Sequence, residues 1–259
     1  MVGVERKAAR RHWHDSCLLL TEVSALLSCL LWPVLYAATV DNAPSGGEIL
    51  ARLADTSSKR QAVTYSGFQE YRLHNLRFDK EAVVLAQVSY RPSEGKRFTV
   101  LERRGCPKLA EIIEKVLASE ADASRPVKLR DHEIGPSNYV AALRGLETRA
   151  GRSCYVVELI PKRKSKYLIK GIAWIDHDSY DLVRLEGATA ASVSMWVGSP
   201  NIQQDFSEFG GLWLPIHTLA VSASLLLGTS ELEIRYMDYI VELDRPFSRA
   251  LDSLPLPRP

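Results

Sequence analysis

The chain has 259 residues, of which 46% are hydrophobic and 25% are charged, an ordinary balance for a globular protein with a sizeable core. The formal net charge is only +2, so no overall basic field indicates a nucleic-acid partner. The sequence shows neither the glycine pattern of a nucleotide-binding loop nor the GxSxG turn of a serine hydrolase. We therefore expect a protein that is not an enzyme and uses no cofactor.

Residues 1–38 differ in kind from the rest of the chain. A basic leader at residues 6–11 precedes an apolar run over residues 23–36, which ends in two alanines. This order is typical of a secretory signal peptide cleaved after Ala37 or Ala38. An uncleaved membrane anchor is the alternative, but the apolar run is shorter than the roughly 20 residues that span a bilayer. We expect an exported protein, periplasmic if its host has two membranes.

The mature chain is predicted to open with a short amphipathic helix over about residues 45–55. Ser45 and Glu48 form a capping box ahead of its apolar residues. A polar break and three strands follow, at about residues 62–73, 82–90 and 96–102. The turn Pro92–Gly95 indicates that the last two strands form a hairpin.

The clearest helix of the chain starts at Pro107, a residue suited to the first helical position, and runs to about residue 121. Its apolar residues recur at helical spacing and form one stripe: Leu109, Ile112, Ile113, Val116 and Leu117. The polar stretch that follows, over residues 121–133, is predicted to be a mobile surface loop.

The most informative stretch runs from Cys154 to Gly187 and predicts three antiparallel strands joined by polar turns. Pairing Ile160 with Tyr167, and Ile175 with Leu182, would place eight apolar side chains on one face. These are Tyr155, Val157, Leu159, Leu168, Ile172, Trp174, Val183 and Leu185. Such a face needs a cover. One interpretation is that this face is permanent core, covered by the helix that starts at Pro107. The other is that the face lines a ligand cavity and that helix is its lid, which would contact the ligand through Leu109, Ile112, Ile113 and Val116.

Two turns of this stretch carry charged or titratable side chains that are candidates for binding or catalysis. The basic turn with Lys162, Arg163, Lys164 and Lys166 is either a solvated loop tip or a contact for anionic lipid head groups or an acidic partner. The sequence Asp176-His177-Asp178 could suggest catalysis or metal binding. It is more typical of a hairpin turn, because no second histidine stands at ligand spacing and aspartates bond their own backbone in turns.

The remaining strands are predicted at residues 192–209, with a break at 198–200, at 212–222 and at 231–243. Gly210-Gly211 indicates a two-residue hairpin. About ten strands and two helices thus form a single domain over residues 39–245, followed by a proline-rich tail at 246–259. The cysteines of the mature chain, Cys106 and Cys154, are either bridged or two separate thiols.

Four segments within about residues 139–241 resemble the C-terminal half of a LolA-like family of outer-membrane lipoprotein-sorting proteins. They read YVVELIPKRKSKYLIKGIAWIDHDSYDLVRLEG, SMWVG, FGGLWLP and TSELEIRYMDY. The resemblance implies an α+β fold, a curved and unclosed antiparallel half-barrel whose concave apolar face is covered by helices. It also implies a periplasmic carrier that shields the acyl chains of lipids or lipoproteins, with transient membrane or membrane-protein contact and without catalytic residues or metal.

A protein of a different class fits the same fold. An envelope-stress sensor or protein-interaction module would bind a protein partner through a sheet edge or the convex face, and would ferry no lipid.

Overall fold

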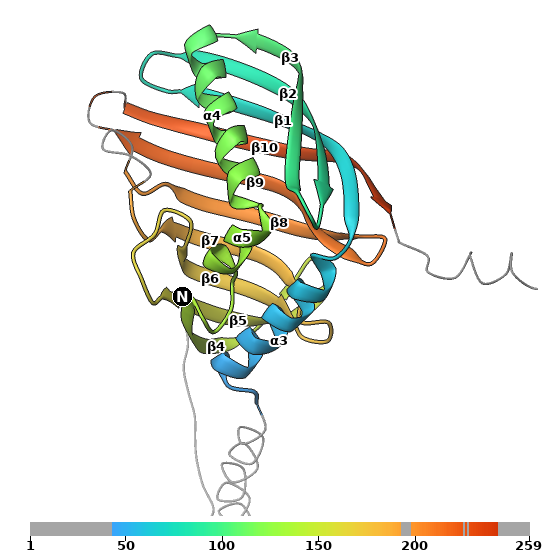
Figure 1. Ribbon diagram of the computed structural model, residues 1–259. Coiled ribbons are helices and arrows are strands. Elements are labelled where there is room, and N and C mark those ends of the chain that lie inside the picture. The colour runs from blue at the N-terminus through green and yellow to red at the C-terminus, as the bar shows by residue number, and fades with distance from the viewer. Residues whose placement is uncertain (1–42, 193–197, 225, 227, 243–259) are drawn as a thin grey trace, which may run out of the picture. The chain divides into compact units, whose positions relative to one another are not determined.

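The computed structural model describes residues 43–192, 198–224, 226 and 228–242. The predicted signal peptide and the proline-rich tail lie outside these residues. From Pro44 on, the described residues belong to one compact unit. In it, ten strands form a single antiparallel sheet, and three helices lie over one face of that sheet (Figure 1). No helix in the described ranges is long and apolar enough to cross a membrane.

The helices are α3 (Gly46–Arg60), α4 (Pro107–Ala123) and α5 (Pro126–His132). The strands are β1 (Thr64–Asn75), β2 (Lys80–Arg91), β3 (Gly95–Gly105), β4 (Tyr139–Arg149), β5 (Arg152–Pro161), β6 (Ile169–Asp176), β7 (Leu182–Thr189), β8 (Asn201–Phe209), β9 (Leu212–Ser224) and β10 (Gly228–Glu242).

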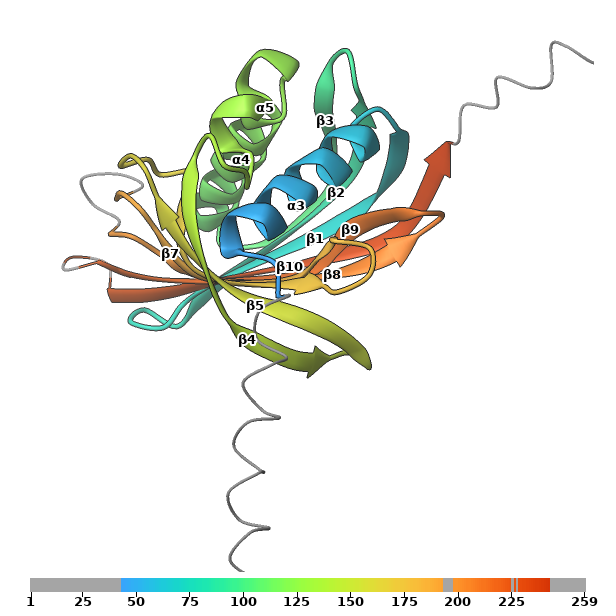
Figure 2. The same ribbon diagram turned by 90° about the horizontal axis from the view of Figure 1, so that it is seen from below.

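The strand order is β3-β2-β1-β10-β9-β8-β7-β6-β5-β4, so the first and last strands of the described chain pair inside the sheet, third and fourth from the β3 edge. β3 and β4 are the two edges, and the sheet does not close on itself. It curves beneath the helices (Figure 2), and we call the face under the helices concave and the other face convex. The predicted α+β architecture, an unclosed antiparallel half-barrel of ten strands with helices over its concave face, is confirmed.

The local signals for α3 and for the hairpins are confirmed. The side chains of Ser45 and Glu48 each accept a hydrogen bond from the other residue's backbone N–H, which forms a capping box. Ser45 is the N-cap, and α3 begins at Gly46. Gly46 docks this end of the helix on β4, where a Cβ atom would lie only 2.6 Å from the Ala141 carbonyl oxygen. Gly210 and Gly211 both have positive φ and join β8 to β9 in a two-residue turn.

The loop predicted over residues 121–133 is wrong in part, because α5 forms within it. Pro126 occupies the first turn of this helix, a position that favours helix formation. None of its residues is buried, so no apolar stripe marked it in the sequence. Lys128 in α5 pairs with Asp122 in α4, and this ion pair joins the two helices.

The predicted register of the central strands is half correct. Ile175 pairs with Leu182 as expected, but Leu159 pairs with Gly171, which excludes the pairing of Ile160 with Tyr167. The turn after β5 runs to residue 168, so β6 begins later and its alternation is reversed relative to β5.

Candidate functional site

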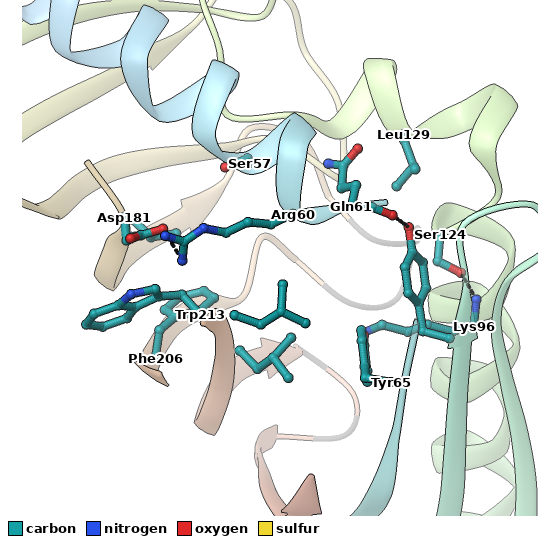
Figure 3. A pocket seen from close by; sticks show the side chains of 14 residues that line it. Ser57, Arg60, Gln61, Tyr65, Lys96, Ser124, Leu129, Asp181, Phe206 and Trp213 are labelled. Carbon is teal, nitrogen blue, oxygen red and sulfur yellow. Dashed lines mark hydrogen bonds and ion pairs between the residues drawn. The ribbon is translucent and has the colours of Figure 1, made fainter. Parts of the chain in front are cut away.

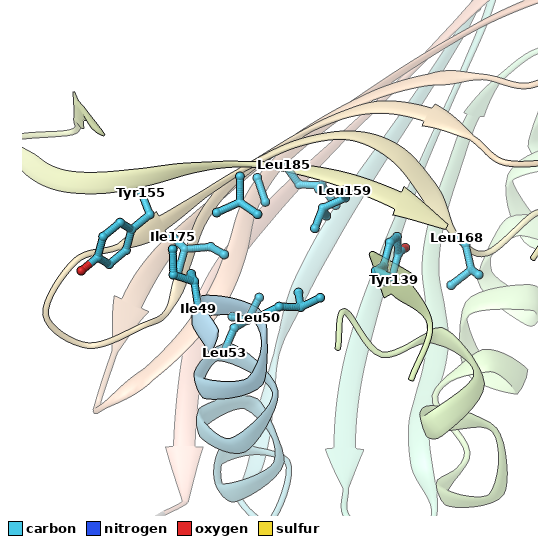
Figure 4. Packing of buried hydrophobic residues seen from close by; sticks show 11 residues of the cluster. Ile49, Leu50, Leu53, Tyr139, Tyr155, Leu159, Leu168, Ile175 and Leu185 are labelled. Carbon is cyan, nitrogen blue, oxygen red and sulfur yellow. The ribbon is translucent and has the colours of Figure 1, made fainter. Parts of the chain in front are cut away.

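One end of the concave face, beneath α3, is packed shut. Ile49, Leu50 and Leu53 of α3 point into the side chains of β5, β6 and β7 (Figure 4). Of the eight residues predicted to share one apolar face, five lie here: Tyr155, Val157, Leu159, Leu168 and Leu185. We call this group with the α3 side chains the α3 cluster. No member is more than 5% exposed. The helix that covers this wall is therefore α3, and the prediction that the helix starting at Pro107 covers it was wrong.

The other three predicted wall residues, Ile172, Trp174 and Val183, lie in a separate cluster with Cys154 and Val156. The reversed alternation of β6 turns Ile172 and Trp174 away from the concave face, and a bulge in the pairing of β6 with β7 turns Val183 with them. Their predicted place beside Tyr155 was therefore wrong.

Trp174 is held on the convex side by polar partners. Its indole Nε1 donates a hydrogen bond of 2.8 Å to Glu147 Oε2. The Arg149 guanidinium lies 4.6 Å from the ring centroid, a cation–π contact. These contacts give Trp174 a structural place among β4, β5 and β6.

The opposite end of the concave face, beneath α4, holds a cavity of about 570 Å³ that we call the α4 cavity. From the helix it is lined by all four residues predicted as lid residues: Leu109, Ile112, Ile113 and Val116. From β1, β9 and β10 it is lined by alternate residues of each strand: Leu73, Asn75, Ala220, Ser222, Ser230 and Leu232. Its remaining lining residues are Phe78, Lys80, Cys106, Lys108 and Pro200.

The cavity exists because α4 packs on only part of the sheet below it. Ile113 and Leu117 contact a buried cluster with Tyr71 and Val84 of β1 and β2, which fixes the distance between helix and sheet. Toward β9 and β10 the sheet presents small side chains instead: Ala220, Ser222 and Ser230. These small side chains leave space between β9, β10 and the helix.

Both ends of α4 are bonded to the β2–β3 hairpin. At its start, the Cys106 backbone N–H donates to the Glu81 carbonyl at 2.8 Å. At its end, Lys96 Nζ of β3 lies 2.5 Å from Glu120 Oε1, and the Lys96 backbone N–H donates to Ser124 Oγ at 2.7 Å. Burial alone would lower the pKa of the Lys96 ammonium, but the Glu120 carboxylate and neighbouring hydroxyls outweigh this and hold the pKa well above its usual range.

A smaller cavity of about 250 Å³ lies near the end of α3, close to the middle of the concave face (Figure 3). Arg60 extends along it to Asp181, with Nη1 2.7 Å from Oδ1, an ion pair without hydrogen-bond geometry. Burial raises the pKa of the Asp181 carboxyl despite this cation. Lys96 and the Tyr65 ring line the far side. Its charged groups are already paired, so this cavity is the weaker candidate.

The predicted basic turn is partly engaged in structure. Lys162 Nζ donates to the Pro136 carbonyl at 2.6 Å, and Arg163 donates to Asn138 Oδ1 at 2.5 Å. Lys166 lies over the Tyr167 ring, 4.8 Å from its centroid. Lys164 is exposed. Head-group contact by this turn stays a prediction, with Lys164 and Lys166 its more available cations.

Asp176-His177-Asp178 forms the turn that the sequence favoured. Asp176 Oδ1 accepts from the backbone N–H groups of Asp178 and Ser179, and Oδ2 accepts from Arg152 Nε at 2.5 Å. Burial opposes ionisation of Asp176, but these donors outweigh it and lower its pKa to about 2. His177 stacks on the Tyr155 ring. Across the described residues no three His, Cys, Asp or Glu side chains are grouped to hold a metal ion.

The two cysteines of the described chain, Cys106 and Cys154, are separate thiols rather than a disulfide. Cys106 precedes α4 and lines the α4 cavity, whereas Cys154 is buried on the convex side.

Sequence reasoning missed the sheet side of the α4 cavity. β1 pairs with β10, which brings Leu73 opposite Leu232 and Asn75 opposite Ser230. Their contact joins segments from the two ends of the described chain, and no local pattern predicts it. The small side chains at Ala220 and Ser222, alternating with Leu219 and Val221, were the available local signal.

No protein-family model matches the sequence, and no curated protein matches it significantly. Among solved structures, LolA superfamily protein NE2245 from Nitrosomonas europaea is similar over 79% of this chain and 96% of its own, with 14% identity and a TM-score of 0.43. A putative outer membrane lipoprotein-sorting protein domain from Vibrio parahaemolyticus is similar over 76% and 97%, with 13% identity and a TM-score of 0.40. The Pseudomonas aeruginosa MucA/MucB complex contains a chain similar over 74% and 100%, with 10% identity and a TM-score of 0.23. Likenesses this distant assign no ligand and no residue role to the present chain.

Proposed function

We propose that this protein binds the acyl chain of a lipid or lipoprotein in the α4 cavity and shields it from water as a periplasmic carrier. The observation that supports this most is the cavity itself. Its volume, about 570 Å³, lies within the range of roughly 300–1,000 Å³ usual for small-molecule sites. Its helix wall is entirely aliphatic from Leu109 to Val116.

The energetics favour an apolar occupant. Phe78 and Ile112, which line the cavity, are 53% and 42% exposed, so a bound chain would remove large apolar side chains from water. Each methylene group of the chain would gain about 0.8 kcal/mol on burial. The polar groups of the wall cost little, because Asn75 Nδ2 already donates to Ser230 Oγ at 2.8 Å.

Entry is proposed to occur beside Phe78 and Ile112, the exposed apolar residues of the lining. Because Cys106 and the Glu120–Lys96 pair hold the two ends of α4, lifting the whole helix would break contacts at both ends. Export is supported by the signal-peptide pattern in residues 1–38.

A matched pair of variants on β9 tests this proposal. Ala220 lines the cavity, and its neighbour Val221 faces the other side of the same strand. We expect Ala220→Phe to fill the cavity and weaken binding of the neutral probe N-phenyl-1-naphthylamine at least about tenfold, a loss of about 1.4 kcal/mol. Val221→Phe should leave binding within about twofold of the unchanged protein.

Thermal unfolding of both variants shows that they are folded, and native mass spectrometry of the unchanged mature chain reports co-purified lipid. Equal binding by the two variants would contradict the cavity assignment. An unchanged protein that is lipid-free and binds no probe would contradict the carrier function as a whole.

The second candidate function is binding of a protein partner, as in the MucA/MucB complex named above. The observation that favours it is the open edge at β4, where Val140 and Leu146 are 55% and 60% exposed. Exposed edge strands can accept a strand from another chain. Affinity capture from an envelope extract distinguishes the two. One stoichiometric protein favours the interaction module, whereas lipid or many lipidated proteins favour the carrier.

A further inference from the structure

We infer that the α4 cavity takes an anionic amphiphile, with its carboxylate or phosphate head group between Lys80 and Lys108 and its apolar tail along α4 toward Val116. This inference rests on the proposed function, because it assigns a chemical class and an orientation to the ligand of the same cavity. It starts from one observation. The only charged side chains that line the α4 cavity, within the described part of the chain, are Lys80 and Lys108.

The two lysines stand at the same end of the cavity. Lys80 is the first residue of β2, and Lys108 lies in the first turn of α4. The hydrogen bond of 2.8 Å from the Cys106 N–H to the Glu81 carbonyl ties these two starting points together. Val116 lies eight residues further along α4, about 12 Å from Lys108 at 1.5 Å per residue. The cavity therefore has a cationic end and an apolar end.

Neither lysine forms an ion pair with a carboxylate of the residues described. The acidic residues nearby face elsewhere. Glu81 pairs with Arg72 at 3.0 Å, and Asp79 Oδ1 lies 3.0 Å from His74 Nε2. Glu111 of α4 faces a groove on the β3 side of the helix. Two ammonium groups at the rim of an apolar cavity thus have no internal counterion.

The start of α4 adds to this positive potential. Its N-terminus has no side-chain cap and no acidic residue in the first turn, so the positive end of the helix dipole there is not offset by a carboxylate and favours an anion. The start of α3 differs, because Ser45 and Glu48 already satisfy it. An acyl carboxylate or a lipid phosphate would supply the missing negative charge beside Lys80 and Lys108 while its chain fills the apolar end.

The test compares ligands that share a chain and differ in head group. Dodecanoate, dodecyl phosphate, dodecanol and dodecyltrimethylammonium would each displace N-phenyl-1-naphthylamine from the folded mature chain. We expect the two anions to bind about tenfold more tightly than dodecanol, and the cation to bind most weakly. Raising the NaCl concentration from about 0.05 M to about 0.5 M should weaken only the anions.

The double variant Lys80→Glu/Lys108→Glu should remove the preference for anions, while dodecanol binding changes less than about twofold. Lys115→Glu, an exposed position of α4 that does not line the cavity, is the matched control and should leave the preference intact. Inorganic phosphate should not displace the probe, which would show that the anion is held as part of an amphiphile.

The outcomes separate the two proposals. If dodecanol and dodecanoate bind equally and the double variant changes neither, the anionic class is overturned while the carrier function stands. If the double variant weakens the binding of all four ligands alike, the two lysines support the structure of the cavity rim rather than bind the head group, and the head-group assignment fails. If no twelve-carbon ligand displaces the probe from the unchanged protein, the proposed function itself fails.

Discussion

The two ends of the concave face differ although each is covered by one amphipathic helix. Beneath α3, the sheet presents large side chains such as Tyr155 and Leu159, and helix and sheet meet without leaving either exposed. Beneath α4, the β9 and β10 side of the sheet presents Ala220 and Ser230, and a cavity of about 570 Å³ remains. Large side chains of the sheet fill the space beneath α3, whereas small side chains of β9 and β10 leave a cavity beneath part of α4.

From this difference we infer that the two helices have different roles. Leu50 and its neighbours in α3 stabilise the fold, because they are buried in a filled cluster. Truncating one of them would lose buried apolar contacts and leave a cavity, which lowers the free energy of unfolding. The cavity-facing side chains of α4, such as Leu109, contribute less to stability and more to what the cavity can hold. The predictions below test this division, beginning with the largest effect.

The largest expected effect is on the α3 side. Leu50→Ala should lower the free energy of unfolding by about 2–5 kcal/mol, because Leu50 is buried in a filled cluster. Leu109→Ala, the same substitution at a half-buried position lining the α4 cavity, should cost less than about 1.5 kcal/mol. Urea unfolding of both variants measures the contrast, and equal losses would show that the two ends do not differ.

The next effect concerns the ties at the end of α4. Glu120→Gln leaves the largely buried Lys96 ammonium without its carboxylate, which should cost about 1–3 kcal/mol. Glu114→Gln, which removes the exposed pair with Arg103, should cost less than about 1 kcal/mol. Hydrogen exchange should show faster exchange in α4 and unchanged exchange in α3 for Glu120→Gln. Loosening of both helices together would contradict the separate roles.

The smallest effect is an acid dependence near the α3 cluster, where Asp176 has a pKa of about 2. Its folded-state pKa is below the unfolded value of about 3.9, so its contribution is complete above about pH 4 and is lost as the pH falls toward 2. Asp176→Asn should remove about 1–2 kcal/mol at neutral pH and flatten that part of the stability curve. Asp178→Asn, at an exposed position of the same turn, is the control. A curve with Asp176→Asn as steep as that of the unchanged protein would refute this role for Asp176.

The sequence predicted the features that depend on neighbouring residues. The capping box at Ser45 and Glu48, the apolar stripe of α4 and the Gly210-Gly211 hairpin each form as expected, because each is a local interaction. The strand count and the open antiparallel architecture are also confirmed. The role of the basic turn and the domain limits stay predictions.

The location of the cavity could not be predicted from local patterns. It depends on the pairing of β1 with β10, which joins residues more than 150 positions apart, such as Asn75 and Ser230. The misplaced Trp174 has a simpler cause. The turn between β5 and β6 is longer than predicted by an odd number of residues, which moves each side chain of β6 to the opposite face of the sheet. The turn sequence itself does not indicate this length.

Photo-crosslinking tests the central claim most directly. A fatty acid with a diazirine at the end of its chain would be bound to the purified protein and irradiated, and its attachment sites would be mapped by mass spectrometry. We predict attachment at residues of the α4 cavity, foremost Ile112, Val116, Ala220 and Leu232. Attachment instead at Tyr155, Leu159 or Leu168 of the α3 cluster would contradict the claim that the end beneath α3 is core and the end beneath α4 binds the chain.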